Sequence, residues 1–387
     1  MPEDYELSAQ RAEFRRWLEE NCPLSLRATG SETPPAWGGR NRSGQAADAL
    51  QWMEAMASRG FITPRWPTDL GGAGLSEAQA AMLSEEMKRI AAPPPIMSFG
   101  LWMLAPILFE YGTEKQRRRF LPPIARGEIR WCQGYSEPGA GSDLAALQTR
   151  CDDAGEHWVI NGQKIWTSDA HLSDWMFCLV RTDRSVKQGG ISFVLMDMNS
   201  PGVERRPIKL ISGASPFCET FFTNVLVPKD QMVGSVNGGW EIAKRLLQYE
   251  RRMISNAGTG RNEPLHEAIV GRGVSLDAGL RDRIERVEMR EQALQLTLTR
   301  ASQEGVSHLA SALKVAGSLL RQDQAELIVD ALGLASLIER PVPQGVVSET
   351  TDLGTWLRSR SATIEGGTTE INLNVIAKHI LRLPDPQ

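Results

Sequence analysis

One carboxylate stands out because it interrupts the apolar face of a predicted helix. The pattern predicts a helix over residues 238–256, and its apolar positions form one stripe: Ile242, Ala243, Leu246, Leu247, Met253 and Ile254. Glu250 lies within that stripe, where a leucine would be usual. Burying a carboxylate is costly unless the group is paired or protonated. Two interpretations are open: a structural ion pair, or a base whose pKa is raised by apolar surroundings.

A second feature is a pair of segments whose groups suit a flat ligand with a polar edge. Residues 131–143 read Trp-Cys-Gln-Gly-Tyr-Ser-Glu-Pro-Gly-Ala-Gly-Ser-Asp, and residues 164–168 read Lys-Ile-Trp-Thr-Ser. The indole of Trp166 would pack on a ring face, and the two hydroxyls that follow would hydrogen-bond to its edge. Taken singly, Trp166 is more often a core residue, and a serine such as Ser136 is more often a turn residue.

The elements that must position these groups fall into three blocks, punctuated by Gly and Pro. Helices are predicted first, over residues 7–20, 44–59, 76–91 and 98–111 with a shorter piece after Gly112-Thr113. Strands follow, over residues 158–160, 163–166, 175–181, 191–196, 203–211 and 220–227, with Asn161-Gly162 predicting a hairpin between the first two. Helices return over residues 238–256, 277–304, 306–332 and 369–382, and residues 257–275 are predicted as loop. This order predicts an α+β chain with domains 1–125, 126–233 and 234–387.

The amino-acid composition limits the classes of function that are compatible with this chain. A chain of 387 residues with a formal charge of -4 and 41% hydrophobic residues is typical of a soluble protein of more than one packed unit, without a nucleic-acid surface. The five cysteines are scattered, which argues against a disulfide framework or a zinc site, and no metal site is expected. No segment has the roughly 20 apolar residues that span a bilayer, and the acidic start lacks a signal-peptide pattern. We therefore expect a cytoplasmic protein.

The segments together resemble one enzyme family. Residues 131–143 and 164–168 resemble the flavin-contacting segment of the acyl-CoA dehydrogenases, and residues 364–372, Ile-Glu-Gly-Gly-Thr-Thr-Glu-Ile-Asn, are similar to the family loop that ends at the flavin. Further matches are Trp66-Pro67 with residues 71–75, and residues 112–116 with Leu121-Pro122 and Gly127-Glu128. The resemblance covers nearly the whole chain. It implies an N-terminal helical domain, a middle β-barrel or sandwich domain and a C-terminal four-helix bundle.

The resemblance also bears on the base. In the commonest branch of the family the catalytic glutamate immediately precedes a Gly-Thr pair, and the matching position here is Gly366. A minority branch carries its glutamate on the central helix directly before an arginine, as in Glu250-Arg251. The loop position lacks a glutamate and the central helix has one, so both differences from the commonest branch favour a base on the helix. Glu250 is therefore predicted as the catalytic base, and Glu365, one residue from the loop position, is the reserve candidate.

Further roles are implied by the same resemblance. FAD is the expected cofactor, held by Gln133, Ser136, Gly141, Ser142, Trp166, Thr167, Ser168, Thr368 and Glu370. Ser142 would also touch the pantetheine arm of an acyl-CoA, Arg251 would steer the CoA end or orient the base, and the Gly366 N–H would bind the thioester oxygen. The expected partners are the acyl-CoA substrate, an electron-transfer flavoprotein and further subunits. These subunits form a homodimer, a homotetramer or a heterotetramer with a second acyl-CoA dehydrogenase-like chain.

Two family elements are missing from the C-terminal third. The Arg-x-x-Phe-Gly segment that reaches a partner's flavin is absent between Ile254 and Glu291, and residues 331–335, Ala-Leu-Gly-Leu-Ala, replace Gln-x-x-Gly-Gly. Similar departures occur in bacterial two-subunit enzymes that act on steroid acyl-CoAs. Two alternatives to the dehydrogenase stay open: a flavoprotein oxidase of the same fold, and a non-catalytic subunit of a heterotetramer.

Overall fold

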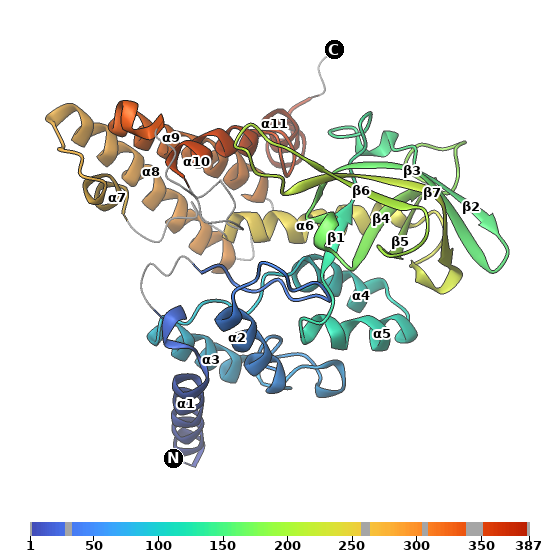
Figure 1. Cartoon of the computed structure of the whole chain (residues 1–387), viewed down its shortest axis with the longest axis horizontal. Helices are drawn as coiled ribbons and strands as arrows, with labels where there is room; N and C mark the ends of the chain where they lie inside the picture. The colour runs from blue at the N-terminus through green and yellow to red at the C-terminus, as the bar shows by residue number, and fades with distance from the viewer. Residues whose placement is uncertain (1, 28–32, 257–263, 304–308, 338–350, 385–387) are drawn as a thin grey trace. The chain divides into compact units, whose positions relative to one another are not determined.

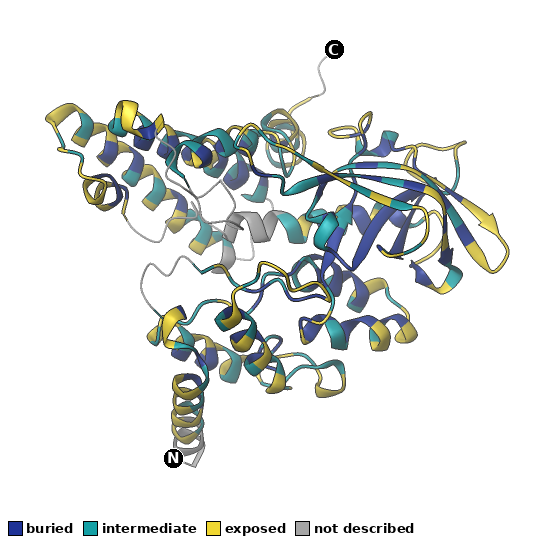
Figure 2. Ribbon diagram, viewed as in Figure 1, coloured by how far each residue is buried: buried dark blue, intermediate teal, exposed yellow. Residues whose placement is uncertain are grey.

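The chain forms two compact units in a computed structural model that describes residues 2–27, 33–256, 264–303, 309–337 and 351–384. Unit 1 comprises Met1–Arg206 and Phe217–Leu246, and unit 2 comprises Pro207–Pro216 and Leu247–Gln387. Within each unit the buried residues gather into apolar cores, which Figure 2 shows in dark blue. Unit 1 carries the predicted flavin-contacting segments, and unit 2 carries Glu250 and the C-terminal loop.

Unit 1 begins with helices, and the first three of them share one apolar core. The helices are α1 (Pro2–Asn21), α2 (Ala47–Ser58), α3 (Glu77–Arg89), a π-helical turn (Gly100–Leu104), α4 (Ala105–Tyr111) and α5 (Glu114–Ala125). Ser76 and Thr113 begin α3 and α5 with reciprocal side-chain and main-chain hydrogen bonds to Gln79 and Gln116, the capping box that fixes a helix start. These helices confirm the predicted N-terminal helical block.

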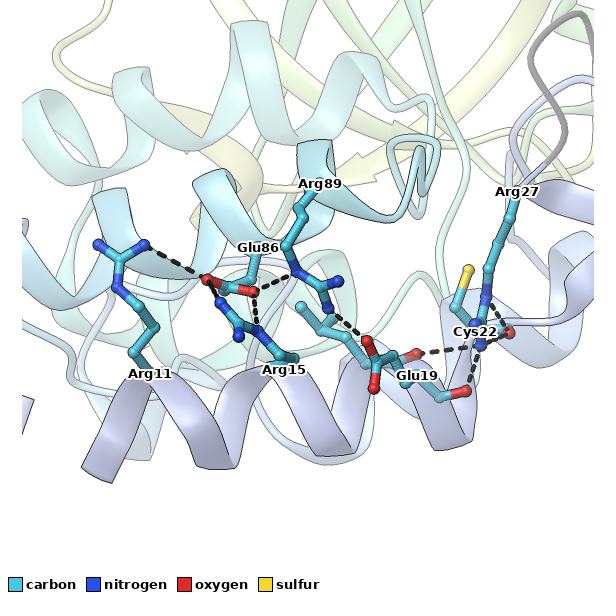
Figure 3. A network of polar contacts seen from close by, with 8 residues as sticks. Arg11, Arg15, Glu19, Cys22, Arg27, Glu86 and Arg89 are labelled. Carbon is cyan, nitrogen blue, oxygen red and sulfur yellow. Dashed lines mark hydrogen bonds and ion pairs between the residues drawn. The ribbon is translucent and has the colours of Figure 1, made fainter. Parts of the chain in front are cut away.

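A buried carboxylate fixes α1 to α3. Glu86 is only 2% exposed, and it accepts hydrogen bonds from Arg15 Nε at 2.9 Å and from Arg89 Nε at 2.7 Å. Arg11 Nη1 lies 3.3 Å from the same carboxylate, so three guanidinium groups surround it (Figure 3). These hydrogen bonds, led by those from Arg15, outweigh burial and lower the pKa of Glu86 from 4.5 to about 2.

The middle of the chain forms one sheet. Among the described residues its strands are β1 (Trp131–Gly134), β2 (Arg150–Ala154), β3 (His157–Ser168), β4 (Trp175–Arg181), β5 (Ile191–Asp197), β6 (Val203–Ile208), β7 (Phe217–Pro228) and β8 (Met232–Val233). Their order is β6-β7-β3-β2-β4-β5-β8, with β1 parallel to β4. The strands β4 and β5 are buried almost throughout, which explains their continuous apolar sequences.

The prediction of a hairpin at Asn161-Gly162 is wrong. These residues lie inside β3, which runs unbroken through them, and the turn comes earlier, between β2 and β3 at Gly155. The register of β3 against β7 shifts between Ile160 and Gly162, so this glycine sits at a bulge. A side chain at Gly162 would lie 2.7 Å from the Thr149 Cα, which explains the glycine without a turn.

Helices and sheet are joined within unit 1 by buried polar contacts. Gln116 on α5 is 3% exposed, and its Nε2 donates to the carbonyls of Asp230 and Met232, each at 2.8 Å. The Asp174 carboxylate at the start of β4 accepts from the N–H groups of Arg40 at 3.0 Å and Arg130 at 2.9 Å. These contacts fix the position of the segment that leads into β1 relative to the helices of unit 1.

After its first segment, the described part of unit 2 is mainly helical. It contains the end of α6 (Gly239–Asn256), α7 (Leu265–Gly271), α8 (Ala278–Gln303), α9 (Ala310–Leu332), α10 (Asp352–Ser359), α11 (Thr369–Val375) and a π-helical turn (Ile376–Ile380). The apolar faces of α7, α8 and α9 share one core, and Figure 1 shows α8 and α9 side by side. Because α7 is a helix, the prediction of a loop over 257–275 is wrong for residues 265–271, while residues 257–263 lie outside the described part.

We predict that Glu86→Gln lowers the free energy of unfolding at pH 7 by about 1–3 kcal/mol, because a buried neutral amide replaces the carboxylate that the arginines bind. The folded pKa lies below the unfolded one, so the contribution of Glu86 is complete above pH 4.5 and disappears as the pH falls towards 2. Urea unfolding at several pH values measures both effects. The matched control is Glu85→Gln, whose exposed carboxylate pairs with Arg11. Equal losses for both variants would contradict this account.

Candidate flavin and acyl-CoA site

The two predicted flavin-contacting segments lie side by side in unit 1. The main-chain N–H of Ile165 on β3 donates to the carbonyl of Ser136 at 2.9 Å, so the chain that leaves β1 runs along the end of β3. Gln133 and Ser136 are half-buried at this junction. Residues 131–143 and 164–168, which are well separated in the sequence, therefore form one continuous surface, which we call the β1–β3 platform.

A buried ion pair holds this platform together. Lys164 and Glu137 are 0% and 8% exposed, and their charged groups lie 2.8 Å apart. Lys164 Nζ also donates to the carbonyl of Tyr135 at 3.0 Å. The carboxylate accepts two further hydrogen bonds from the N–H groups of Gln148 and Thr149, at 2.6 and 2.9 Å. Burial alone would raise the pKa of Glu137, but Lys164 and these donors more than compensate, and the pKa is lowered.

Trp166 has the geometry of a functional residue. Its side chain is 53% exposed, so core packing does not explain an indole at this position. Its backbone is left-handed, with φ +59°, at an irregularity in the pairing of β3 with β7. Such a conformation is rare for a bulky residue and costs roughly 1–3 kcal/mol. The ring meets Phe217 edge to face, with centroids 6.1 Å apart, which leaves an indole face available to a ligand.

The hydroxyls that follow Trp166 differ in accessibility. Ser168 is half-buried beside the indole. Thr167 is fully buried, and within the described structure its Oγ1 has no hydrogen-bond partner. A contact between the Thr167 side chain and a cofactor would need local movement, and its FAD role stays a prediction.

The glycine-rich turn of the platform is accessible to a ligand. Glu137 and Ala140 exchange main-chain hydrogen bonds at 3.1 and 3.0 Å, which closes the turn. Gly141 and Ser142 beyond it are exposed. A Cβ added at Gly141 would meet no atom within 4 Å, so the glycine is not required by packing within the protein. A glycine in open space is suited to close approach of a ligand to the backbone.

The C-terminal loop of unit 2 is shaped by two glycines. Gly366 and Gly367 are both left-handed, with φ +64° and +88°, a conformation that other residues adopt only with strain. Thr368 then begins α11 by accepting a hydrogen bond from the N–H of Ile371 at 3.2 Å. Glu370 is exposed in the first turn of that helix, where hydrogen bonds from its own N–H and from Thr368 lower its pKa.

The two candidate bases differ in their surroundings. Glu365 forms an ion pair with Arg358 at 2.7 Å, with the two side chains 38% and 18% exposed, so its carboxylate already has a structural role in unit 2. Glu250 is half-buried on α6, one turn after the fully buried Leu246. The side chains of Arg251, Met253 and Ile254 lie outside the described residues, so the arginine and the second half of the predicted stripe stay predictions.

Three residues with structural roles at these sites escaped the sequence analysis. Glu137 sits in a turn-like run and Lys164 in an alternating strand, where both patterns predict exposed side chains. Lys314 on α9 is only 3% exposed and donates to the carbonyl of Gly367 at 2.7 Å. An isolated charged residue in the sequence does not show which distant residue it contacts, so no sequence pattern would have indicated these contacts.

The platform fits a flavin better than a metal. An exposed indole with half-buried amide and hydroxyl groups around it suits a planar ring with a hydrogen-bonding edge. In the portion of the chain with described coordinates, no group of three or more His, Cys, Asp or Glu side chains is arranged to hold a metal ion.

Within the same portion, every helix is too short or too polar to cross a bilayer.

A helical domain, a β domain carrying the platform and a second helical domain are the parts of an acyl-CoA dehydrogenase. Family models for the N-terminal, middle and C-terminal domains of acyl-CoA dehydrogenase match residues 6–128, 132–225 and 237–381. The acyl-CoA dehydrogenase IpdE1 of Mycobacterium tuberculosis is 36% identical over 97% of each chain. The chain therefore belongs to the acyl-CoA dehydrogenase family of flavoprotein oxidoreductases, and this confirms the predicted fold class.

Solved structures give the same result. The Tcur3481-Tcur3483 steroid ACAD superimposes with a TM-score of 0.75 at 28% identity, covering 99% of this chain and 98% of that chain. The ChsE4-ChsE5 complex from Mycobacterium tuberculosis gives a TM-score of 0.70 at 27% identity, covering 98% of each chain. Both similarities extend over the complete fold.

We predict that Lys164→Met costs about 3–5 kcal/mol in unfolding free energy, because it leaves the Glu137 carboxylate buried without its counter-charge. The matched control is Lys187→Met, since Lys187 pairs with Asp143 at the same 2.8 Å but both side chains are 61% exposed. That loss should stay within about 1 kcal/mol. Chemical denaturation of both variants measures the difference. Similar losses would show that the buried pair is not what holds the platform.

Proposed function

We propose that this chain is an FAD-dependent enzyme that removes the α and β hydrogens of an acyl-CoA thioester and forms the 2-enoyl-CoA. The exposed, left-handed Trp166 on the β1–β3 platform carries this proposal, because strain at an accessible aromatic residue is best explained by a ligand. When bound, FAD supplies the acceptor for the hydride that leaves the β carbon.

The proposed FAD contacts are those that the family resemblance implies. In unit 1, Trp166 covers the ring, and Gln133, Ser136 and Ser168 meet its polar edge, with Gly141 and Ser142 beside the open turn. The resemblance adds Thr368 and Glu370, which lie at the start of α11. Ser142 also contacts the pantetheine arm of the substrate, and Arg251 steers the CoA end or orients the base.

Glu250 is the proposed base. The hydrogen α to a thioester is weakly acidic, so removing it requires a positioned carboxylate together with stabilisation of charge on the carbonyl oxygen. Glu250 stands half-buried on a helix, which restricts its position. The main-chain N–H of Gly366 supplies a hydrogen bond to the thioester oxygen in this proposal.

The substrate class is proposed from the relatives. The Tcur3481-Tcur3483 structure is described as a steroid ACAD, and the ChsE4-ChsE5 structure is described as a complex. We propose a large, ring-bearing acyl-CoA as the first substrate class to test, together with a second acyl-CoA dehydrogenase-like subunit. An electron-transfer flavoprotein is the proposed electron acceptor. Hydrogen peroxide made in air would instead indicate an oxidase of the same fold.

Our prediction for the base is that Glu250→Gln slows reduction of bound FAD by acyl-CoA by at least roughly 10² to 10⁴, the contribution of a general base. The amide keeps the shape and hydrogen-bonding capacity of the side chain, so substrate binding should persist. Stopped-flow absorbance under anaerobic conditions measures the rate. In the parallel variant Glu365→Gln the rate should change far less, and a collapse there with a normal rate in Glu250→Gln would transfer the role to Glu365.

For the platform, we predict that Trp166→Ala raises the Kd for FAD by at least roughly tenfold, because the stacked ring is lost. Thermal stability of the FAD-free protein should hardly change, since the indole is 53% exposed. Flavin content after gel filtration and a fluorescence titration measure retention, and Trp166→Phe, which keeps an aromatic ring, should recover most of it. Loss of stability that matches the loss of flavin would mean that Trp166 is a packing residue.

A further inference from the structure

A buried lysine lies beneath the C-terminal loop of unit 2. Lys314 on α9 is 3% exposed, and its sequence neighbour Leu313 is 8% exposed in the apolar core of that unit. Lysine is almost never buried without a partner, because removing an ammonium group from water is costly. The contacts of Lys314 should therefore reveal why this site holds a charged residue.

Those contacts converge on one carbonyl oxygen. Lys314 Nζ donates to the carbonyl of Gly367 at 2.7 Å. Asn372 on α11 is also 3% exposed, and its Nδ2 donates to the same oxygen at 2.8 Å and to the carbonyl of Thr368 at 3.0 Å. Two buried donors on different helices thus fix the orientation of a single peptide group.

That peptide group belongs to the part of the loop with the most conformational freedom. Gly366 and Gly367 are consecutive left-handed residues, and glycine loses more backbone entropy on ordering than any other residue. Just before them, the N–H of Glu365 donates to the carbonyl of Ser361 at 2.9 Å, and just after them Thr368 caps α11. The hydrogen bonds from Lys314 and Asn372 to the Gly367 carbonyl supply the restraint between these two anchors.

The charge of Lys314 is matched by the loop itself. Burial lowers the pKa of its ammonium, and the carboxylates of Glu365 and Glu370 oppose that shift. These carboxylates stand on either side of the glycine pair. Their attraction for the ammonium group adds to the hydrogen bond by which Lys314 holds the loop to α9.

We propose that Lys314 is a positioning residue for the reaction: it holds the Gly367 carbonyl so that the neighbouring Gly366 N–H keeps the orientation needed to bind the thioester oxygen. This inference rests on the proposed function. It assigns Lys314 no contact with substrate or FAD.

The test compares the wild-type chain, with its partner subunit if one is required, with Lys314→Met and Gln324→Met. Methionine keeps the length of Lys314 without its charge, and Asn372 still satisfies the Gly367 carbonyl. The control residue Gln324 is also 3% exposed on α9, but it donates to Glu291 at 2.9 Å instead of to the loop. Two quantities are measured: hydrogen exchange of residues 364–372 in the FAD-free protein, and the rate of FAD reduction by acyl-CoA.

The inference predicts faster exchange of this loop in Lys314→Met and a rate of FAD reduction lower by roughly 10²-fold, with the Kd for acyl-CoA nearly unchanged. Gln324→Met should change neither the exchange of residues 364–372 nor the rate. Should Lys314→Met fail to fold, Lys314→Gln, which keeps a donor but loses the charge and reach, replaces it with the same expected direction.

The outcomes separate the two proposals. Normal FAD reduction in a folded Lys314 variant overturns the positioning role, whether or not exchange of the loop increases. Equal slowing in Gln324→Met also overturns it, because the slowing would then result from the loss of any buried polar side chain on α9. A wild-type protein that holds FAD but is not reduced by any acyl-CoA overturns the proposed function and the catalytic part of this inference together.

Discussion

The buried ion pair between Lys164 and Glu137 is the interaction on which the candidate flavin platform depends. It joins the segment after β1 to β3, and the carboxylate binds the main chain at residues 148 and 149 as well. Without this pair, the segment that carries Ser136 would lose its buried ionic contact with β3, the strand that carries Trp166. A buried charge pair stabilises little by comparison with apolar packing, but losing one member is severe, so it fixes one arrangement of the segments. The strained backbone of Trp166 needs such a rigid support.

A similar principle operates in unit 2, where a flexible loop is fixed from a rigid helix. Lys314 and Asn372 hold the carbonyl of Gly367, the second of two consecutive left-handed glycines, and Arg358 holds Glu365. In each unit a buried cation orders the backbone of a segment that carries proposed binding groups. The groups proposed to bind FAD and substrate are thus separate from the groups that set their geometry.

The sequence predicted the block order and most elements because apolar periodicity is strong in this chain; β4, for example, was predicted to the residue. It failed at Asn161-Gly162, where a glycine required for close approach to Thr149 imitates a turn. It failed again at α7, whose seven residues are too short for a clear period. The side chains proposed for catalysis were recognisable from linear motifs. Glu137, Lys164 and Lys314 were not, because each owes its burial to a partner distant in the sequence.

If this chain transfers hydrogen from an acyl-CoA to FAD bound at the β1–β3 platform, the substrate alone should reduce the flavin. The most direct test is an anaerobic titration of the FAD-loaded protein, alone and with its partner subunit, against a panel of acyl-CoAs that includes ring-bearing ones. The account predicts that flavin absorbance bleaches and that the enoyl-CoA formed equals the FAD reduced. A protein that holds FAD and binds acyl-CoA but forms no enoyl-CoA with any of them, with or without the partner, would contradict the account.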